Sequence, residues 1–470
     1  MHDVENHKET YFNDQWTCSI HQLGYDDFAI KARDLILSAP TPFAMTIGGR
    51  WGAGKTSMLR TLKESLSWEK RKGTEEEGGP LPETIPRLDR QQLKTVQTVW
   101  FNPWQYQHEP NPIIPLLHEI RAQVSLPQQL AKGSAEQVRR GFMAGIRTFP
   151  ALIDDAANIM GANRFSSGKH LLQQIDKETA AEEMEQFKLP TDAQRFFKRF
   201  EEAVYLVTNP WGHSGKDNNI RLVVFIDDLD RCSDQTVFSL LERIKLYLSS
   251  RYCVFVFALD RTHVENAVAR AGGYSRIEAA QYVEKLFQAK LYLPTLDQDL
   301  LKRFIVDAMN TIGFNIDIAA HSYLLSLLPP NPRTIKNFMN GLGFMKQFFG
   351  KRDPKEAVLL YWLRSYVPDV YDLLAQDPQT IHQDLVAVCK EGLLAGEIGV
   401  RWFINYHLEN PLLQTEGSVP PEAQKTKLDT HSAQDEHYRQ LQAGVWQARA
   451  LKTFKTEYIS TFGMTPPALF

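Results

Sequence analysis

The sequence predicts an α/β protein of three layers, in which helices cover both faces of a mostly parallel, five-stranded sheet. Short apolar runs alternate with amphipathic stretches at helical spacing, the pattern that builds parallel sheets. The chain has 470 residues, of which 43% are hydrophobic and 23% charged. These fractions are ordinary for globular proteins, and the length favours about three domains, or one large domain with additions.

Five apolar runs are the predicted strands: Pro42–Ile47, Val96–Phe101, Leu222–Ile226, Cys253–Ala258 and Ala289–Leu293. Helical spacing predicts helices around Phe28–Ile36, over Lys55–Trp68, from an N-cap at Thr191 to about Val207, and over Gln235–Ser249 and Glu278–Phe287. Between the helix predicted at Lys55–Trp68 and the second predicted strand, residues 69–90 contain three prolines and three glycines among mixed charges. We expect an exposed loop there.

The remaining segments suggest the domain organisation. Residues 102–190 look helical with proline breaks, so we expect a helical insert. The chain from about 295 onward also looks helical. We therefore predict a core over residues 1–345 and a helical C-terminal region over 346–470. Residues 409–437, rich in Pro, Gln, Thr and Glu, are expected to be a polar linker before a terminal helix at His437–Phe462.

Charge and cysteine usage exclude several classes of protein. The net charge of −3 does not indicate nucleic-acid binding. Four scattered cysteines form neither a disulfide framework nor a zinc spacing. The polar N-terminus is no signal peptide, and no apolar run approaches the roughly 20 residues of a membrane span. We expect a cytoplasmic protein without an integral membrane span, and peripheral membrane association stays open.

The first predicted strand leads into a sequence that fits a phosphate-binding loop, the Walker A pattern GxxxxGK[ST]. Its glycines allow the backbone to curl so that successive N–H groups face phosphate oxygens. Lys55 would place a positive charge on the β- and γ-phosphates and assist catalysis, and the Thr56 hydroxyl is a ligand for Mg²⁺. The expected nucleotide contacts are Gly49, Arg50, Trp51, Gly52, Ala53, Gly54, Lys55, Thr56 and Ser57.

The third predicted strand ends in carboxylates, as a Walker B strand does. Asp227 is placed to hold Mg²⁺ directly or through water. Asp228 could polarise the attacking water as a general base, and Asp230 could share that task. Arg231 and Arg261 could stabilise transition-state charge, although a structural ion pair is equally compatible with each.

Three further features could belong to the same site, each with a structural alternative. Asp260, at the tip of the fourth strand, could sense the γ-phosphate or cap a helix. Arg333 could reach the nucleotide from a helical lid or be a solvated charge. The aromatic stretch Trp100–Tyr106, which includes Asn102, could form a wall of the site or pack in the core. The histidines, among them His263, carry no recognisable catalytic or metal pattern.

Together these segments resemble the KAP family of P-loop NTPases. The matching motifs follow the family order over about residues 20–345 and comprise Gly49–Ser57, Phe101–Trp104, Phe225–Cys232, Phe257–Arg261 and Asn331–Lys336. The resemblance implies the P-loop NTPase fold, with an extra strand between the phosphate-loop strand and the acidic strand. It implies Mg²⁺-dependent hydrolysis of ATP or GTP, with Lys55 and Thr56 on phosphate and metal, Asp227 on metal and Asp228 as base.

Family members include membrane-linked scaffolds and bacterial phage-exclusion proteins, and many carry transmembrane helices in the insert, which this sequence lacks. Our first hypothesis is a molecular switch driven by nucleotide hydrolysis, in bacterial antiphage defence. The second is a scaffold that binds nucleotide with negligible turnover, because the inserts and the C-terminal region offer surface for a protein partner or self-association. A third, a phosphotransferase, uses the same loop, but no acceptor site is recognisable.

Overall fold

The computed structural model describes most of the chain, in segments. They are residues 12, 23–49, 51–67, 81–86, 95–124, 136–161, 192–209, 220–247, 250–314, 322–349, 353–392, 399–409, 430–463 and 465–467. They form two compact units, one from Tyr25 to Pro294 and one from Thr295 onward that includes Phe12, Leu23 and Gly24. The division falls inside the stretch assigned to the core from sequence, so the boundary at residue 345 stays a prediction.

The first unit is built on a parallel sheet of five strands in the order β2-β3-β4-β1-β5. The strands are β1 (Phe43–Gly48), β2 (Val96–Phe101), β3 (Arg221–Ile226), β4 (Cys253–Leu259) and β5 (Ala289–Tyr292). Every residue of β3 and β4 is buried, as expected of central strands covered on both faces. The predicted α/β fold is confirmed, and β4 is the extra strand between β1 and β3.

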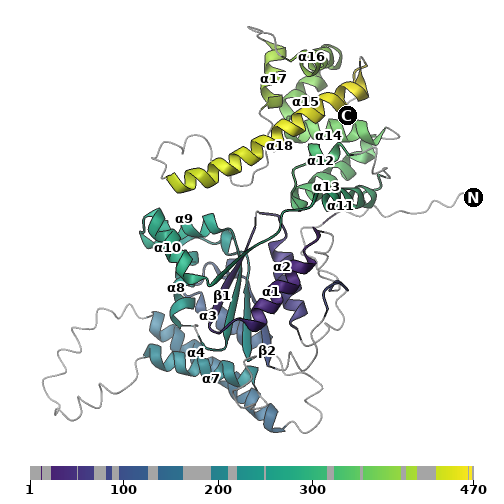
Figure 1. The fold of residues 1–470 in the computed structure, drawn as a ribbon. Coiled ribbons are helices and arrows are strands. Elements are labelled where there is room, and N and C mark those ends of the chain that lie inside the picture. The colour runs from purple at the N-terminus through teal and green to yellow at the C-terminus, as the bar shows by residue number, and fades with distance from the viewer. Residues whose placement is uncertain are drawn as a thin grey trace, which may run out of the picture. The chain divides into compact units, whose positions relative to one another are not determined.

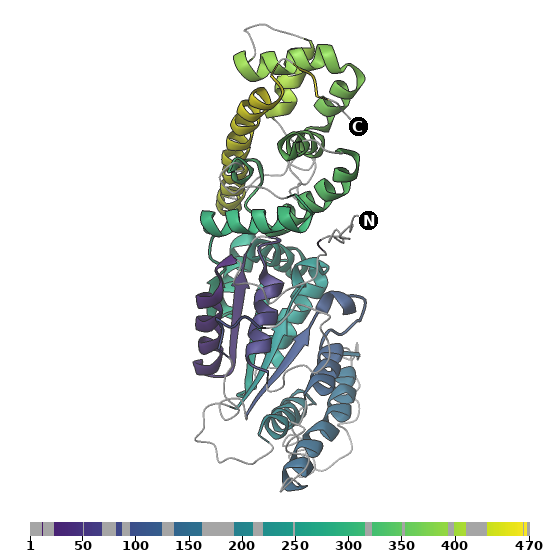
Figure 2. The same cartoon turned by 90° about the vertical axis from the view of Figure 1, so that its right-hand side faces the viewer.

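Helices cover both faces of this sheet (Figures 1 and 2). On one face lie α1 (Asp26–Ser38) and α2 (Lys55–Ser65), and on the other α8 (Asp234–Tyr247), α9 (Arg261–Gly272) and α10 (Arg276–Leu286). Helix α9 was not foreseen, because its apolar positions Val264, Ala267 and Val268 are few and small.

The helical insert packs beside β2 and shares the core of the sheet. It contains α3 (Ile113–Gln123) and α4 (Glu136–Gly161), and α4 lies against α7 (Asp192–Thr208). Gly145 allows the close approach of these two helices, since a Cβ there would come within 2.9 Å of Leu206 and Val207. Phe196 and Phe200 of the predicted aromatic stripe are fully buried. Thr191 lies outside the described residues.

The second unit is helical, and prolines begin several of its helices. Its elements are α11 (Gln298–Thr311), α12 (Leu324–Leu327), α13 (Pro332–Phe349), α14 (Pro354–Tyr366), α15 (Pro368–Gln376), α16 (Pro378–Glu391), α17 (Val400–Glu409) and α18 (Thr430–Phe462). Proline suits the first helical position, where its missing N–H costs no hydrogen bond. Buried Trp362 anchors the core, with its ring on Phe454 at 4.7 Å and its Nε1 donating to Leu327 O.

Two expectations about connecting segments were wrong in part. The polar linker 409–437 is too long, because α17 ends at Glu409 and α18 already begins at Thr430. No proline or glycine lies between Pro421 and Gly444, and polar residues such as Glu and Gln are good helix formers. In the loop 69–90, residues 81–86 are not simply exposed: Ile85 is buried, and Pro86 O accepts a 2.6 Å hydrogen bond from buried Arg33 of α1.

Candidate functional site

The sheet brings the sequence-predicted motifs to one edge. All five strands are parallel, so the segments that follow β1, β2, β3 and β4 leave at the same side. In open α/β sheets this carboxyl edge is where ligands bind. The segment that starts at Gly49 leaves β1, Asn102 follows β2, Asp227 follows β3, and Asp260 follows β4.

The loop after β1 has the backbone conformation that its glycines permit. Gly52 and Gly54 have φ of 78° and 96°, in the left-handed region that favours glycine. Gly54 is the N-cap of α2, so the amides of its first turn face the loop without helical partners. The amino end of a helix and a curled loop together form an anion-binding site. Arg50 lies outside the described residues.

The loop is held from the inside by Tyr25 and Lys55. Buried Tyr25, just before α1, places its hydroxyl 3.4 Å from Ala53 O as a donor, and burial raises its pKa to about 12. Lys55 Nζ donates to Gly49 O at 2.9 Å and lies 3.9 Å from Asp230 Oδ2. Both charged side chains are only 10% exposed. Lys55 therefore points back into the curl of the loop, where a phosphate would enter.

Asp227 is the most deeply buried carboxylate of the site. Its side chain is 3% exposed, and burial, with the nearby Asp228 carboxylate, raises its pKa from 3.8 to about 6. The Thr56 hydroxyl donates a hydrogen bond to it, which opposes that rise. Burying a carboxylate is costly unless a cation or donors compensate.

This donor set fits Mg²⁺. Thr56 and Asp227 both offer hard oxygen ligands, and Mg²⁺ is commonly held by one or two protein groups together with substrate phosphates and water. The described residues contain no cluster of three or more His, Cys, Asp or Glu that could hold a metal without such help.

Asp228 is held at three points. Its φ of 55° makes it the one non-glycine residue in the left-handed region within the described segments. Asn102 Nδ2 donates a 2.9 Å hydrogen bond to its Oδ2, and Arg231 Nε lies 2.9 Å from its Oδ1. Strained residues of this kind cluster at functional sites. Through this hydrogen bond of Asn102, the segment after β2 lies against Asp228 and forms part of the wall of the candidate site.

Two tryptophans surround Arg231. The Arg231 Cζ lies 5.2 Å from the ring of Trp51 in the loop and 5.4 Å from the ring of Trp104. Both indoles are substantially exposed, at 38% and 43%. We call Trp51, Arg231 and Trp104 the tryptophan–arginine cluster. Arg231 and Trp51 both belong to motifs that the sequence assigns to the site, but their contact depends on three separate loops that meet only in the fold.

Asp230 and His263 follow the two neighbouring strands β3 and β4 at the carboxyl edge of the sheet. Burial raises the pKa of Asp230; the charges of Lys55 and His263 oppose that rise, whereas Asp228 and Asp260 add to it. His263 Nε2 is buried without a hydrogen-bond partner among the described residues. The sequence around His263 has no catalytic or metal-binding pattern. Its position in the first turn after β4, beside the acidic strand, was the available signal.

The other predicted residues have structural partners. Asp260 caps α9, accepting from Thr262 N at 3.0 Å and His263 N at 3.4 Å, and Arg261 pairs with Glu265. Arg333 belongs to the second unit, where its backbone N–H donates to Asn331 Oδ1 at the start of α13. The phosphate-sensing roles proposed for Asp260 and Arg333 stay predictions.

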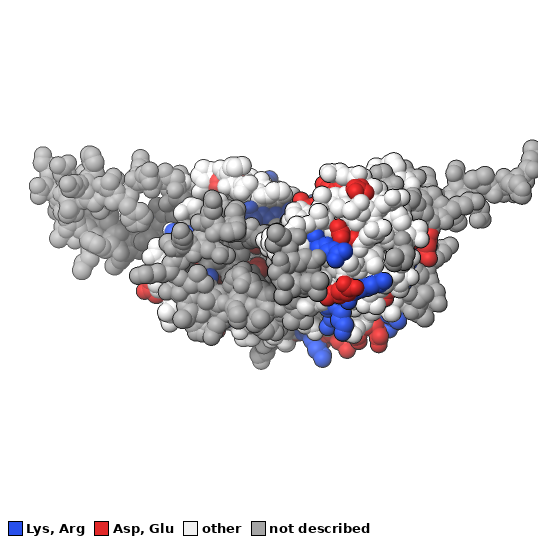
Figure 3. Space-filling model, turned by 90° about the horizontal axis from the view of Figure 1, so that it is seen from above, with Lys and Arg blue, Asp and Glu red and all other residues white. Residues whose placement is uncertain are grey.

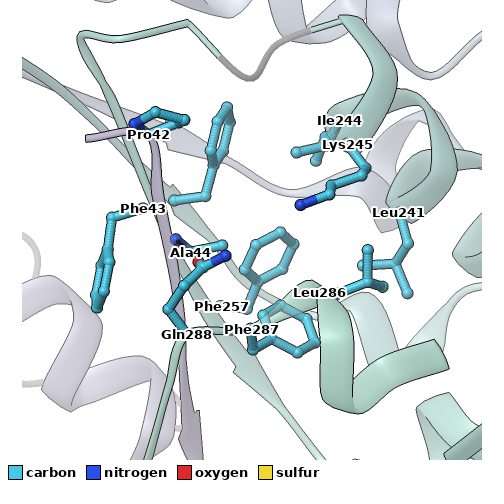
Figure 4. A pocket seen from close by; sticks show the side chains of 11 residues that line it. Pro42, Phe43, Ala44, Leu241, Ile244, Lys245, Phe257, Leu286, Phe287 and Gln288 are labelled. Atoms are coloured by element: carbon cyan, nitrogen blue, oxygen red, sulfur yellow. Dashed lines mark hydrogen bonds between the residues drawn. The ribbon is translucent and has the colours of Figure 1, made fainter. Parts of the chain in front are cut away.

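A separate concavity lies toward the amino ends of the strands (Figure 4). It encloses about 450 Å³, part of it open to solvent, between the start of β1, the end of α8 and the segment that follows α10. Phe43, Phe257 and Phe287 line it, with Lys245 and Gln288 at its margin. Gln288 Oε1 accepts from Ala44 N at 2.7 Å, which ties this side chain to the edge of β1. Its lining is apolar and lacks the carboxylates of the loop site.

Surface charge on the face drawn in Figure 3 is mixed. Basic and acidic side chains of the described residues lie interspersed there. An electrostatic footprint for nucleic acid would gather basic residues on one face. Among the described residues, no helix is both long and apolar enough to cross a membrane.

The family model described as the KAP family P-loop domain matches residues 25–349, which is most of the chain. The chain belongs to the KAP family. The matched range includes both the loop after β1 and the acidic end of strand β3. The search of curated proteins found no match to this chain.

Similar solved structures include the ORC2 protein of Aeropyrum pernix in ADPNP–ADP complexes, with 12% identity, 97% of each chain covered and a TM-score of 0.37. The ADP form of the same protein has 11% identity over the same coverage, also with a TM-score of 0.37. The Walker-type ATPase paby2304 of Pyrococcus abyssi has 11% identity over 93% of this chain and 95% of that one, with a TM-score of 0.34. Similarity at this level carries no argument about function.

Proposed function

We propose that this KAP protein binds a nucleoside triphosphate with Mg²⁺, hydrolyses its β–γ bond, and uses the change of nucleotide state as a molecular switch. The observation that carries the proposal is the position of Lys55, whose Nζ lies 2.9 Å from Gly49 O in the phosphate loop and 3.9 Å from Asp230 Oδ2. The amine of the loop therefore faces the acidic segment that follows β3, where a nucleotide phosphate and its metal would bind. ATP is the substrate we expect, with GTP as the alternative.

Each residue has a role that follows from its position. The loop amides and Lys55 bind the β- and γ-phosphates, and Thr56 and Asp227 hold the metal. When bound, Mg²⁺ neutralises charge on the phosphate oxygens. Asp228 accepts the proton of the attacking water, and Asp230 lies close enough to Lys55 to orient its amine. Arg231 orients the carboxylate of Asp228. The Arg231 side chain is 30% exposed, which is also compatible with direct stabilisation of transition-state charge.

The experiment is phosphate release from ATP and GTP with Mg²⁺, together with binding of a fluorescent ATP analogue. Lys55→Ala should reduce nucleotide affinity, whereas Asp228→Asn should retain affinity and lose turnover. Asn tolerates the left-handed conformation of residue 228, so the substitution removes the base without adding backbone strain. Lys63→Ala, in the last turn of the same helix α2, is the matched control and should change neither quantity. Unchanged affinity in Lys55→Ala would refute the site.

A scaffold with negligible turnover is the second candidate, and one observation favours it. Both carboxylate oxygens of Asp228 are engaged by Asn102 and Arg231. Each oxygen keeps a free lone pair, but the two partners fix the direction of the carboxylate, so it acts as a base only if the attacking water lies within reach of a remaining lone pair. Tight Lys55-dependent binding without phosphate release would support this reading.

The biological setting that we propose is bacterial antiphage defence, with a protein partner or self-association as the output. The support is the resemblance of the motifs to family members that exclude phage. Phage plaquing on a host that carries the wild-type gene, compared with the Lys55→Ala and Lys63→Ala variants, tests it. Protection that survives Lys55→Ala would contradict a nucleotide-driven switch.

A further inference from the structure

We propose that the tryptophan–arginine cluster is a positioning device for Asp228, and that Trp51 makes this device sensitive to occupancy of the phosphate loop. The inference rests on the proposed function. It deepens that function by naming residues that control the hydrolytic step and not the binding step. Three segments that follow different strands meet in the cluster: Trp51 follows β1, Trp104 follows β2 and Arg231 follows β3.

The Arg231 guanidinium contacts both a carboxylate and two aromatic rings. Its Nε lies 2.9 Å from Asp228 Oδ1, and its Cζ is within cation–π distance of both indoles. A planar guanidinium can pair with a carboxylate through its edge while its face contacts an aromatic ring. The two tryptophans therefore restrict the directions that Arg231 can take, and Arg231 in turn restricts the carboxylate of Asp228.

Asp228 is also held by its own backbone and by the segment after β2. Its backbone is in the left-handed region, and its other carboxylate oxygen accepts from Asn102. Asn102 belongs to the same short segment as Trp104, because Asn102 Oδ1 accepts from Trp104 N at 3.0 Å and caps the turn Pro103–Tyr106. One segment after β2 thus holds Asp228 twice, directly through Asn102 and indirectly through Trp104 and Arg231.

Trp51 connects the phosphate loop to Arg231. It is the third residue of the loop that starts at Gly49, and glycines with positive φ follow it at positions 52 and 54. An indole in the middle of this loop is 38% exposed, and its ring contacts the arginine that pairs with Asp228. Any shift of the loop on phosphate binding is therefore transmitted to Arg231. This gives a physical route from nucleotide binding to the carboxylate.

The test separates turnover from binding in variants of the cluster. Trp104→Ala should lower kcat about tenfold while the KM and the Kd of a fluorescent ATP analogue change less than about threefold, because misplacing a general base affects only the chemical step. Trp104→Phe, which keeps an aromatic face, should recover most of the loss. Trp104 is 43% exposed, so neither change threatens the fold. Arg231→Lys keeps the charge and should lower kcat as much as Trp104→Ala.

Non-additivity is the decisive readout. If the residues act as one device, the double variant Arg231→Lys, Trp104→Ala should be no slower than the slower single variant. Multiplicative losses would mean that the two residues act independently and would overturn the proposal. The matched control is Arg251→Lys, an exposed arginine that stacks on Tyr252 at 5.8 Å before β4, and its kcat should equal that of the wild type.

Tryptophan fluorescence tests the connection to the loop. In a Trp104→Phe background, which removes the other indole of the cluster, nucleotide should change the emission. The change should disappear when Trp51→Phe is added but persist when Trp402→Phe is added, whose indole is comparably exposed on α17. A change that persists in Trp51→Phe would overturn this part. A wild type without turnover would refute the proposed hydrolysis, whereas normal turnover in every cluster variant would refute the positioning device alone.

Discussion

Asn102 and Asp228, 126 residues apart in the sequence, join the ends of two neighbouring strands through a 2.9 Å hydrogen bond. Asn102 follows β2, which pairs with β3, and Asp228 follows β3 after Asp227. The amide also caps the turn after β2 through its oxygen. A single side chain therefore shapes the wall of the site and holds the residue that we propose as base.

Asn102→Asp isolates this contact. The aspartate keeps the oxygen that caps Trp104 but replaces the donor to Asp228 with a second carboxylate. We expect the free energy of unfolding to fall by about 1–2 kcal/mol, the typical effect of an unmade hydrogen bond at a partly buried site. Urea denaturation measures it. In the Asp228→Asn background the same substitution should cost much less, because the repulsion is gone. An equal cost in both backgrounds would contradict a direct Asn102–Asp228 contact.

Asp227→Asn should stabilise the nucleotide-free protein while it removes activity. Burial raises the pKa of Asp227 to about 6, above its ordinary value of 3.8. A carboxyl group whose pKa is raised by folding favours the folded state at low pH, and this contribution is lost as pH rises through about 6. The difference corresponds to a cost on the order of 2–3 kcal/mol for the ionised group near pH 7.5.

Thermal unfolding between pH 4 and pH 8 checks this. The wild type, relative to Asp227→Asn, should lose stability between about pH 4 and pH 6 and then level off. Magnesium with nucleotide should restore the wild type but not the variant. A lower melting temperature for Asp227→Asn at pH 8 would contradict the burial cost. Asp234→Asn, at the start of α8, serves as the control, because Asp234 is half-buried and pairs with exposed Arg270 outside the site.

The sequence predicted most of the sheet because its central strands are apolar on both faces. The predicted limits of β2, Val96–Phe101, are those of the structure. Three other strands differ from the prediction by one residue at one end, and β1 is shifted by one residue at both ends. Strong local periodicity and the turn glycines determine such elements. Segments without a distinctive apolar pattern were harder, and so α9 was missed and the start of α18 was placed too late.

The site was predicted in its motifs but not in its contacts. The positions of Lys55, Thr56 and Asp227 follow from local spacing, since each motif occupies one loop. The contacts of Arg231 with Trp51 and Trp104 depend on strand order, which places residues from three loops side by side. The buried position of His263 next to Asp230 depends on the same order. Pairings of this kind require the tertiary structure.

Tyr25→Phe tests whether the loop is held from its inner side. Tyr25 immediately precedes α1, and its hydroxyl donates to Ala53 O in the phosphate loop. The residue is 2% exposed. Removing the hydroxyl keeps the ring and its packing, so we expect stability to fall by no more than about 1 kcal/mol. The loop should sample more conformations, and the KM for nucleotide should rise a few-fold while kcat changes little.

Steady-state kinetics and nucleotide titration measure the effect. Tyr458→Phe is the matched control, because Tyr458 is equally buried, its hydroxyl lies 3.0 Å from His382 Nδ1, and it belongs to the second unit. It should leave the KM unchanged. A Tyr25→Phe protein with wild-type KM would show that the 3.4 Å contact does not order the loop.

Asp260 allows the capping role of a residue to be separated from a role in sensing phosphate. Its carboxylate accepts two backbone N–H groups at the start of α9, and Ser275 caps α10 in a similar way through Glu278 N. Asp260→Ala and Ser275→Ala should each lower stability by about 1 kcal/mol, the usual value of an N-cap. Asp260→Asn should retain the cap, since asparagine caps helices as well as aspartate does.

Turnover of Asp260→Asn then reports on the charge alone. If Asp260 senses the nucleotide, this variant should bind nucleotide normally, unfold at the wild-type denaturant concentration and hydrolyse ATP about tenfold more slowly, as expected when one electrostatic contact to the reacting groups is lost. Ser275→Ala should keep wild-type turnover despite its lower stability. Wild-type turnover in Asp260→Asn would restrict Asp260 to its structural role, because the cap and the fold would be intact and only the charge would be missing.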